Sequence, residues 1–352
     1  MEPMADVQWE HYPHVAASET ARAWLVLGSN LGLAANTLDA YGRALEEYIT
    51  FSQGREVAVN SATKDHIAAY VRYLTSRPSR RALNVVALDS GAGLANATLQ
   101  QRITAIRLFY DYVMEEGLRP NNPVGRGRYT PGKGFAGSRD RGLIPRFTKL
   151  PWIPSDQQWH AVLEATRKEP VRNRTMLALS YDTALRREEL CGLDTSDLDP
   201  ARRTIRVRAE NTKNRRERVV PYSPATGDLL AAYLHRRREI NRERGRLFIS
   251  ESRRNRGKPI SIWTWSKVVE RISERCGVLE FTTHSSRHLC LTDLARANWD
   301  VHEIAAFAGH RSIQTTLLYI HLSGRELASK LAKGMAEIHA WRARVLKEVL
   351  SE

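Results

Sequence analysis

The second half of the chain contains, in this order, TALRREE at residues 183–189, NTKNRRERVVP at 211–221, HSSRH at 284–288 and GHRSIQTTLLY at 309–319. These four motifs combine guanidinium, ammonium, imidazole, carboxylate and phenol groups. A planar guanidinium binds phosphate oxygens through paired hydrogen bonds, and a phenol attacks phosphorus once a base removes its proton. The motifs therefore indicate chemistry at a phosphate ester.

The pattern His-x-x-Arg is short enough to arise by chance, and it occurs three times in the chain. His235 with Arg238 and His339 with Arg342 share the spacing. Only the pair within residues 284–288 has a histidine directly after its arginine, and a Gly-His pair and a tyrosine downstream. The order and spacing of all the motifs, rather than any one of them, support the interpretation.

The motifs resemble, position by position, those of the tyrosine recombinases, or phage integrases, roughly over residues 18–323. That family has an arginine in a Thr-Gly-Leu-Arg-like turn, a lysine in a β-hairpin, a His-x-x-Arg, a late histidine or tryptophan, and a tyrosine. Asn122-Pro123 also resembles the usual end of the family's helical DNA-binding domain, whereas Ala184 stands where the family usually has glycine. The resemblance implies a site-specific recombinase or integrase of a mobile genetic element. Such an enzyme cuts and rejoins DNA strands through a 3′-phosphotyrosine intermediate.

The resemblance assigns catalytic roles to six side chains, which are Arg186, Lys213, His284, Arg287, His310 and Tyr319. The two arginines would clamp the phosphate as it gains negative charge, and His310 would donate a hydrogen bond to it. Tyr319 is the implied nucleophile, and His284 is the implied base that takes its proton. Lys213 is the implied acid that protonates the departing 5′-oxygen.

Two further residues, Glu189 and His288, are supporting candidates. Glu189 matches the family's acidic residue three positions after the first arginine, and it would orient the basic side chains. A histidine held by a buried carboxylate is also an ordinary structural arrangement, so a purely structural role stays open for both. No metal ion or other cofactor is implied, because the motifs contain neither the clustered carboxylates of a two-metal site nor a Gly-x-x-x-x-Gly-Lys phosphate loop.

The fold class follows from apolar periodicity and from the resemblance. Helices are expected to start near Thr37, Thr63 and Thr98, each with apolar residues three and four positions apart, and Gly117 is expected to end the third. They predict a small N-terminal helical bundle. The resemblance adds a mixed, mainly helical catalytic domain, so the whole chain is expected to be mainly α with a small antiparallel β-sheet.

The second half of the chain carries its own local signals. Helical patterning covers residues 159–166 and 174–181. The β-branched runs 204–208 and 218–221 predict a hairpin. Helices are expected again from Trp263 onward, where Asp300 with Glu303 forms a capping box for a helix through Phe307.

Four segments are expected: a DNA-binding domain at 1–124, a basic Gly-rich linker at 125–150, a catalytic domain at 151–323 and a helical tail at 324–352. The linker is either a solvated tether or a segment that contacts phosphates. The candidate DNA-binding residues of the linker and the hairpin turn are Arg126, Arg128, Lys133, Arg139, Arg141, Arg215 and Arg216. The tail either packs on its own protomer or joins protomers into a tetramer on DNA, as the resemblance suggests.

The charge balance predicts a polyanionic partner. Lys and Arg number 54 against 39 Asp and Glu, which gives a net charge of +15, so a double-stranded DNA recombination site is the expected partner. No run approaches the roughly 20 apolar residues of a membrane span, and the cytoplasm is the expected compartment. The three cysteines have neither the spacing of a zinc site nor that of a disulfide framework.

Two other functions are compatible with parts of the pattern. A type IB topoisomerase resembles this family in its arginines, lysine and tyrosine, but it relaxes one duplex as a monomer without exchanging partners. A DNA-binding regulator would keep the scaffold without activity. The presence of every reactive group argues against the regulator.

Overall fold

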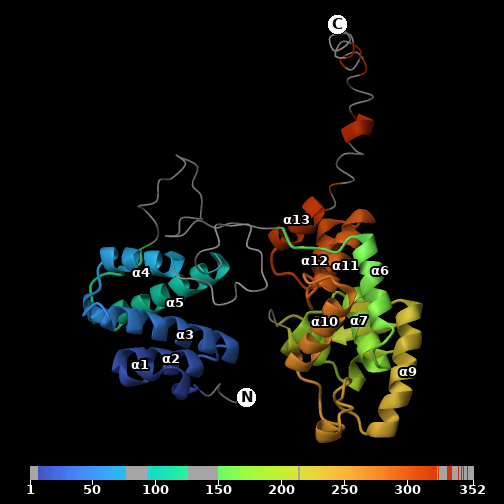
Figure 1. The fold of residues 1–352 in the computed structure, drawn as a ribbon, viewed down its shortest axis with the longest axis horizontal. Helices are drawn as coiled ribbons and strands as arrows, with labels where there is room; N and C mark the ends of the chain where they lie inside the picture. The colour runs from blue at the N-terminus through green and yellow to red at the C-terminus, as the bar shows by residue number, and fades with distance from the viewer. Residues whose placement is uncertain are drawn as a thin grey trace. The chain divides into compact units, whose positions relative to one another are not determined.

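The structure, a computed structural model, describes residues 7–76, 94, 96–125, 150–212, 215–322, 324 and 331–334, together with residues 340, 342, 344 and 347. The chain divides into two compact units, Met1–Thr148 and Lys149–Glu352 (Figure 1). Helices dominate both units, and the described strands form one small antiparallel sheet in the second. The expected fold class is therefore confirmed. None of the helices in the described ranges is long and apolar enough to cross a membrane.

The first unit is a helical bundle. Its elements are η1 (Trp9–His11), α1 (Pro13–Ala17), α2 (Glu19–Asn30), α3 (Ala35–Gln53), η2 (Val59–Ser61), α4 (Lys64–Ser76) and α5 (Asn96–Glu115). The long helices α3 and α5 pack against each other, and their apolar stripes bury Leu45, Tyr48 and Phe109 almost completely. The three expected helices are confirmed, although the third begins at Asn96 rather than at Thr98.

Capping chemistry explains where these helices begin and end. Oγ1 of Thr63 accepts a hydrogen bond from the backbone N–H of His66 at 3.3 Å, which satisfies a donor that the first turn of α4 leaves without an intrahelical partner. Gly117 follows α5 with a φ of 71°, a conformation that side chains disfavour. The expected cap and the expected stop are both confirmed.

The second unit surrounds its sheet with helices. Its helical elements are α6 (Asp156–Thr166), α7 (Val171–Asp182), α8 (Arg187–Cys191), η3 (Thr195–Asp197), η4 (Ala209–Asn211), α9 (Pro224–Ile240), η5 (Arg253–Asn255), α10 (Ile262–Cys276), α11 (Ser285–Arg296), α12 (Val301–Ala308) and α13 (Ile313–Leu322). The strands β1 (Leu198–Asp199), β2 (Thr204–Val207) and β3 (Arg218–Pro221) lie in that order, and neighbouring strands are antiparallel. The expected hairpin is confirmed as β2 and β3, with Ile205 opposite Val220. Neither β1, which is too short to show a periodicity, nor α9 was predicted.

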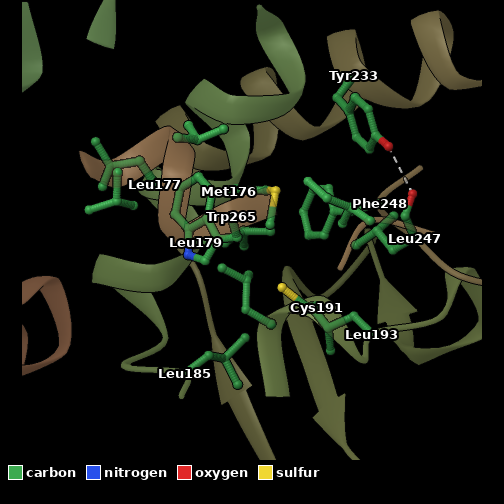
Figure 2. Packing of buried hydrophobic residues seen from close by; sticks show 14 of the residues in the cluster. Met176, Leu177, Leu179, Leu185, Cys191, Leu193, Tyr233, Leu247, Phe248 and Trp265 are labelled. Carbon is green, nitrogen blue, oxygen red and sulfur yellow. Dashed lines mark hydrogen bonds between the residues drawn. The ribbon is translucent and has the colours of Figure 1, made fainter. Parts of the chain in front are cut away.

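A continuous apolar core holds the second unit together (Figure 2). Trp265 of α10 lies beside Met176 and Leu179 of α7, and all three are almost fully buried. Tyr233 of α9 lies at one side of this core, and its hydroxyl donates to the carbonyl of Leu247 at 2.9 Å. Fully burying an apolar side chain such as Met176 or Leu179 contributes about 1.5–3 kcal/mol to stability. This core includes Leu185 of the first motif and Val220 of the second, whereas Tyr319 packs in a separate apolar cluster with residues of α11 and α12.

Helices α11, α12 and α13 lie together at one end of the second unit (Figure 1). The expected capping box of α12 is confirmed, because the side chain of Asp300 accepts from the N–H of His302 at 2.7 Å and the side chain of Glu303 accepts from the N–H of Asp300 at 2.9 Å. At the other end, Gly309 has a φ of 62°, and the N–H of His310 donates back to the carbonyl of Ala305 at 2.9 Å. This turn stops α12 and leads the chain into α13.

Candidate active site

Tyr319 lies on α13 with a side chain that is only 4% exposed. Its ring packs near Ala184 and Ile304 and stacks on the imidazole of His310, with ring centroids 6.0 Å apart. Its hydroxyl oxygen lies 2.9 Å from Nδ1 of His288. Burial raises the pKa of Tyr319 above its ordinary value, although nearby guanidinium groups lower it again. The phenol is therefore protonated at neutral pH.

The two histidines beside Tyr319 are both neutral at pH 7. Burial, helped by the positive charges around it, lowers the pKa of His288 to about 4. Burial and the neighbouring arginines lower the pKa of His310 to about 3. A neutral imidazole has one nitrogen with a free lone pair, so His288 can accept the proton of the phenol when that lone pair is on Nδ1.

His284, the base expected from the sequence, is also at this site but in a different position. It directly precedes α11 and is exposed, with its ring centroid 6.3 Å from that of His288. The hydrogen bond to the phenol of Tyr319 is made by His288, one helical turn later. His288, which the sequence ranked as supporting, thus contacts Tyr319.

The C-terminal end of α12 is covered by arginines from three separate elements of the described chain. Arg218 lies on β3, Arg287 on α11 and Arg186 directly before α8. Each donates to one carbonyl at this helix end. The pairs are Arg218 with Phe307 at 3.0 Å, Arg287 with Ala308 at 2.7 Å and Arg186 with Gly309 at 3.3 Å. The last carbonyls of a helix lack intrahelical partners and carry partial negative charge. This helix end therefore gathers distant guanidinium groups into one site.

Arg287 is almost completely buried. Its Nη1 donates to the carbonyl of Ala184, and its Nη2 lies 3.0 Å from Nε2 of His310. Because a guanidinium only donates, Nε2 of His310 is the acceptor of that bond. Burial and the charge of Arg186 lower the pKa of Arg287 to about 10, so it remains charged at neutral pH. Ala184 holds its carbonyl there with a φ of 47°, a left-handed conformation unusual for alanine.

Glu189 lies between Arg186 and Arg218 with a side chain that is 1% exposed. Its oxygens accept from Nη1 and the backbone N–H of Arg186 at 2.8 and 2.9 Å. They also accept from Nη1 and Nη2 of Arg218 at 3.2 and 2.7 Å. Burial alone would raise the pKa of Glu189, but the hydrogen bonds and charges of the two arginines hold it at about 2. Arg218 was not a sequence candidate, because one arginine on a strand of a basic chain gives no local signal.

Six of the sequence candidates lie outside the described residues; they are Lys213, Arg126, Arg128, Lys133, Arg139 and Arg141. Arg215 and Arg216 are described, and both are exposed in the turn between η4 and β3. That turn is held by Thr212, whose carbonyl accepts from the N–H of Arg215 at 3.1 Å and whose hydroxyl accepts from the N–H of Arg216 at 3.0 Å. Across the described ranges, no group of three His, Cys, Asp or Glu residues is arranged to hold a metal ion.

Two family models match this chain. The model of the phage integrase family matches residues 154–326, and the model of the phage integrase N-terminal SAM-like domain matches residues 24–117. The first match contains all four motifs. The second covers helices α3, α4 and α5 of the first unit. Together the two matches extend over most of the chain.

Known relatives agree with both matches. The tyrosine recombinase XerC of Corynebacterium glutamicum is 29% identical over 73% of this chain and 78% of its own length, and XerC of Mycobacterium tuberculosis is 28% identical over 79% and 92%. Among solved structures, XerH bound to a palindromic difH substrate shares the fold with a TM-score of 0.67 at 18% identity, covering 94% of this chain and 90% of that one. A λ integrase dimer bound to a COC′ core site shares the fold with a TM-score of 0.61 at 16% identity, covering 86% of this chain and 94% of that one. The chain therefore belongs to the phage integrase family, the tyrosine recombinases, and is a DNA-cutting and rejoining enzyme of site-specific recombination.

Proposed function

We propose that Tyr319 is the nucleophile that opens the DNA strand. Its phenol oxygen bonds to phosphorus, the bond from phosphorus to the 5′-oxygen breaks, and a 3′-phosphotyrosine joins the enzyme to DNA. Attack by another 5′-hydroxyl reverses these steps and reseals a strand, so the energy of the phosphate ester bond is kept. The observation that carries this proposal is the 2.9 Å contact between the hydroxyl of Tyr319 and a neutral His288.

Arg186 and Arg287 form the phosphate clamp in this proposal. The attacked phosphate gains negative charge on its non-bridging oxygens, and preorganised guanidinium groups stabilise that charge without rearranging. Both arginines are already fixed by backbone carbonyls and, for Arg186, by Glu189. His310 accepts from Arg287 and stacks on Tyr319, and its Nδ1 pairs with Thr316, so in this proposal it holds both residues beside the phosphate rather than donating to the phosphate itself.

The base is His288 rather than His284 in our proposal, because His288 already contacts the phenol oxygen. We expect His288→Ala to slow formation of the covalent adduct on the order of 100-fold, and His284→Ala to slow it less. Single-turnover cleavage of a DNA duplex by each variant measures this directly. A larger loss in His284→Ala would restore the assignment made from the sequence. The pKa of about 4 for His288 also predicts that wild-type cleavage is not lost near the ordinary histidine pKa of about 6.5 as the pH falls.

Lys213 is the proposed acid for the departing 5′-oxygen. The described residues on both sides of it, Thr212 and Arg215, belong to the turn that precedes β3. A turn at the end of a strand can bring a long, flexible ammonium side chain to a substrate held beside the strand. Its proton would go to the 5′-oxygen as that oxygen leaves phosphorus.

The partner is a duplex recombination site, and the working form is a tetramer linked through the tail at 324–352. The net charge of +15 suits a duplex, and the tail has apolar residues at helical intervals. We expect removal of residues 324–352 to weaken assembly on a full site more than binding of one protomer to a half-site. Gel-shift titrations on both DNAs measure this, and an equal loss on both would show that the tail packs on its own protomer.

A further inference from the structure

Arg218 is a charged residue at the edge of the site that the reaction does not use directly. Its side chain is only 9% exposed. Its Nε donates to the carbonyl of Phe307, and Nη1 and Nη2 donate to the two carboxylate oxygens of Glu189. Each of the three guanidinium nitrogens therefore donates one hydrogen bond within the protein. Through these three bonds Arg218 holds protein groups in place.

The surroundings of Arg218 leave it little freedom. A Cβ added at Gly309 would lie 2.9 Å from Nη1 of Arg218, so the guanidinium is packed directly against the turn that precedes His310. A buried charge is costly unless it is paired and hydrogen-bonded. The bidentate contact with Glu189 meets that requirement. One rigid contact set therefore joins β3, the start of α8 and the end of α12.

The contact between Arg218 and Glu189 also affects Arg186, a residue of the proposed clamp. The carboxylate that Arg218 grips is the same one that binds Nη1 and the backbone N–H of Arg186. Without Arg218, Glu189 would be buried with one cationic partner instead of two, and its carboxylate could shift relative to Arg186. The carbonyl of Phe307, next to the turn at Gly309, would also lose its donor.

We infer that Arg218 is a positioning residue that fixes Arg186, through Glu189, and the Gly309-His310 turn relative to each other around the scissile phosphate. The inference rests on the proposed clamp role of Arg186. Arg218 also stands five residues after Lys213 in the sequence and is the first residue of β3. The same side chain thus anchors that strand to the clamp.

A substrate of altered charge separates positioning of the clamp from general stabilisation of the fold. A methylphosphonate at the cleavage site replaces one non-bridging oxygen by a methyl group, so less negative charge develops during attack. Relative to wild type, an enzyme with a defective clamp should be slowed less on this substrate than on the natural phosphodiester. An enzyme with a damaged fold would be equally slow on both.

The experiment measures single-turnover cleavage of both substrates by full-length Arg218→Ala, with Arg186→Ala as the clamp control. Arg206→Ala is the matched arginine control, because Arg206 is exposed on the neighbouring strand and pairs with Glu217. We expect Arg218→Ala to cleave the phosphodiester on the order of 100-fold more slowly than wild type. The ratio of the wild-type rate to the Arg218→Ala rate should be smaller on the methylphosphonate. The same is expected for Arg186→Ala. Arg206→Ala should cleave both like wild type.

The outcomes distinguish failure of the positioning role from failure of the proposed clamp. Wild-type cleavage by Arg218→Ala, or an equal defect on both substrates while Arg186→Ala is rescued, would overturn the positioning role alone. A failure of Arg186→Ala to gain from the methylphosphonate would overturn the proposed clamp and this inference with it. If Arg218→Ala does not fold, Arg218→Lys takes its place, because it keeps the charge beside Glu189 but not the bidentate contact. Arg218→Lys should then also show a smaller rate defect on the methylphosphonate than on the phosphodiester. An equal defect on both substrates would count against the inference.

Discussion

Tyr319→Phe is expected to abolish covalent attachment to DNA while binding to the recombination site stays nearly unchanged. The substitution removes one hydroxyl and its contact with His288 but keeps the ring that packs near Ala184 and Ile304. Loss of one such hydrogen bond costs about 1 kcal/mol of stability, too little to unfold a domain. DNA affinity comes mainly from many phosphate contacts. Denaturing gels detect the adduct, and gel shifts under native conditions measure the binding.

Tyr181→Phe is the matched control for this experiment. Tyr181 lies on α7 of the same unit, and its hydroxyl donates to Asp293 at 2.8 Å. The control therefore removes a hydrogen-bonded phenol oxygen of the same unit that has no part in the proposed reaction. It should form the adduct at close to the wild-type rate. A covalent adduct formed by Tyr319→Phe would place the nucleophile on another residue.

Lys213→Ala is expected to be slow on natural DNA and close to wild type on DNA whose bridging 5′-oxygen is sulfur. An alkoxide is a poor leaving group unless it is protonated, so loss of a general acid should slow cleavage between about 100- and 10,000-fold. A thiol has a pKa of about 8.5, judged by free cysteine, so its thiolate departs without a proton donor. Cleavage rates of the variant on the two substrates, each divided by the wild-type rate, measure the rescue.

Arg215→Ala and Arg216→Ala test whether the rescue is specific to Lys213. Both arginines are exposed in the same turn, and they are expected to change the salt dependence of DNA binding without a selective gain from sulfur. If Lys213 instead stabilises the non-bridging oxygens, sulfur would give no relief, since that charge develops whichever atom leaves. An enzyme equally impaired on both substrates would argue against the proton-donor role.

The regular elements could be predicted wherever the cause of the structure is local. The helices that became α3, α4 and α5 follow from apolar residues three and four positions apart. The cap at Thr63 and the capping box of Asp300 with Glu303 depend on a few neighbouring residues, and both are present. The strand β1 and the helix α9 escaped prediction. A strand of two residues exists only through its pairing with β2, and α9 carries few buried residues among many charged ones.

The sequence by itself determined the family and the chemical groups of the site, because the spacing of the motifs holds reactive residue types in a fixed order. It could not tell which of His284 and His288 contacts Tyr319, because both have the same side chain and lie one helical turn apart. Only the tertiary structure places Tyr319 of α13 against His288. The same holds for Arg218, which meets Glu189 and Phe307 from positions 29 and 89 residues away in sequence. Contacts of that kind depend on how helices and strands pack. The carbonyls at the end of α12, which lack partners within the helix, meet the three arginines only in the packed structure.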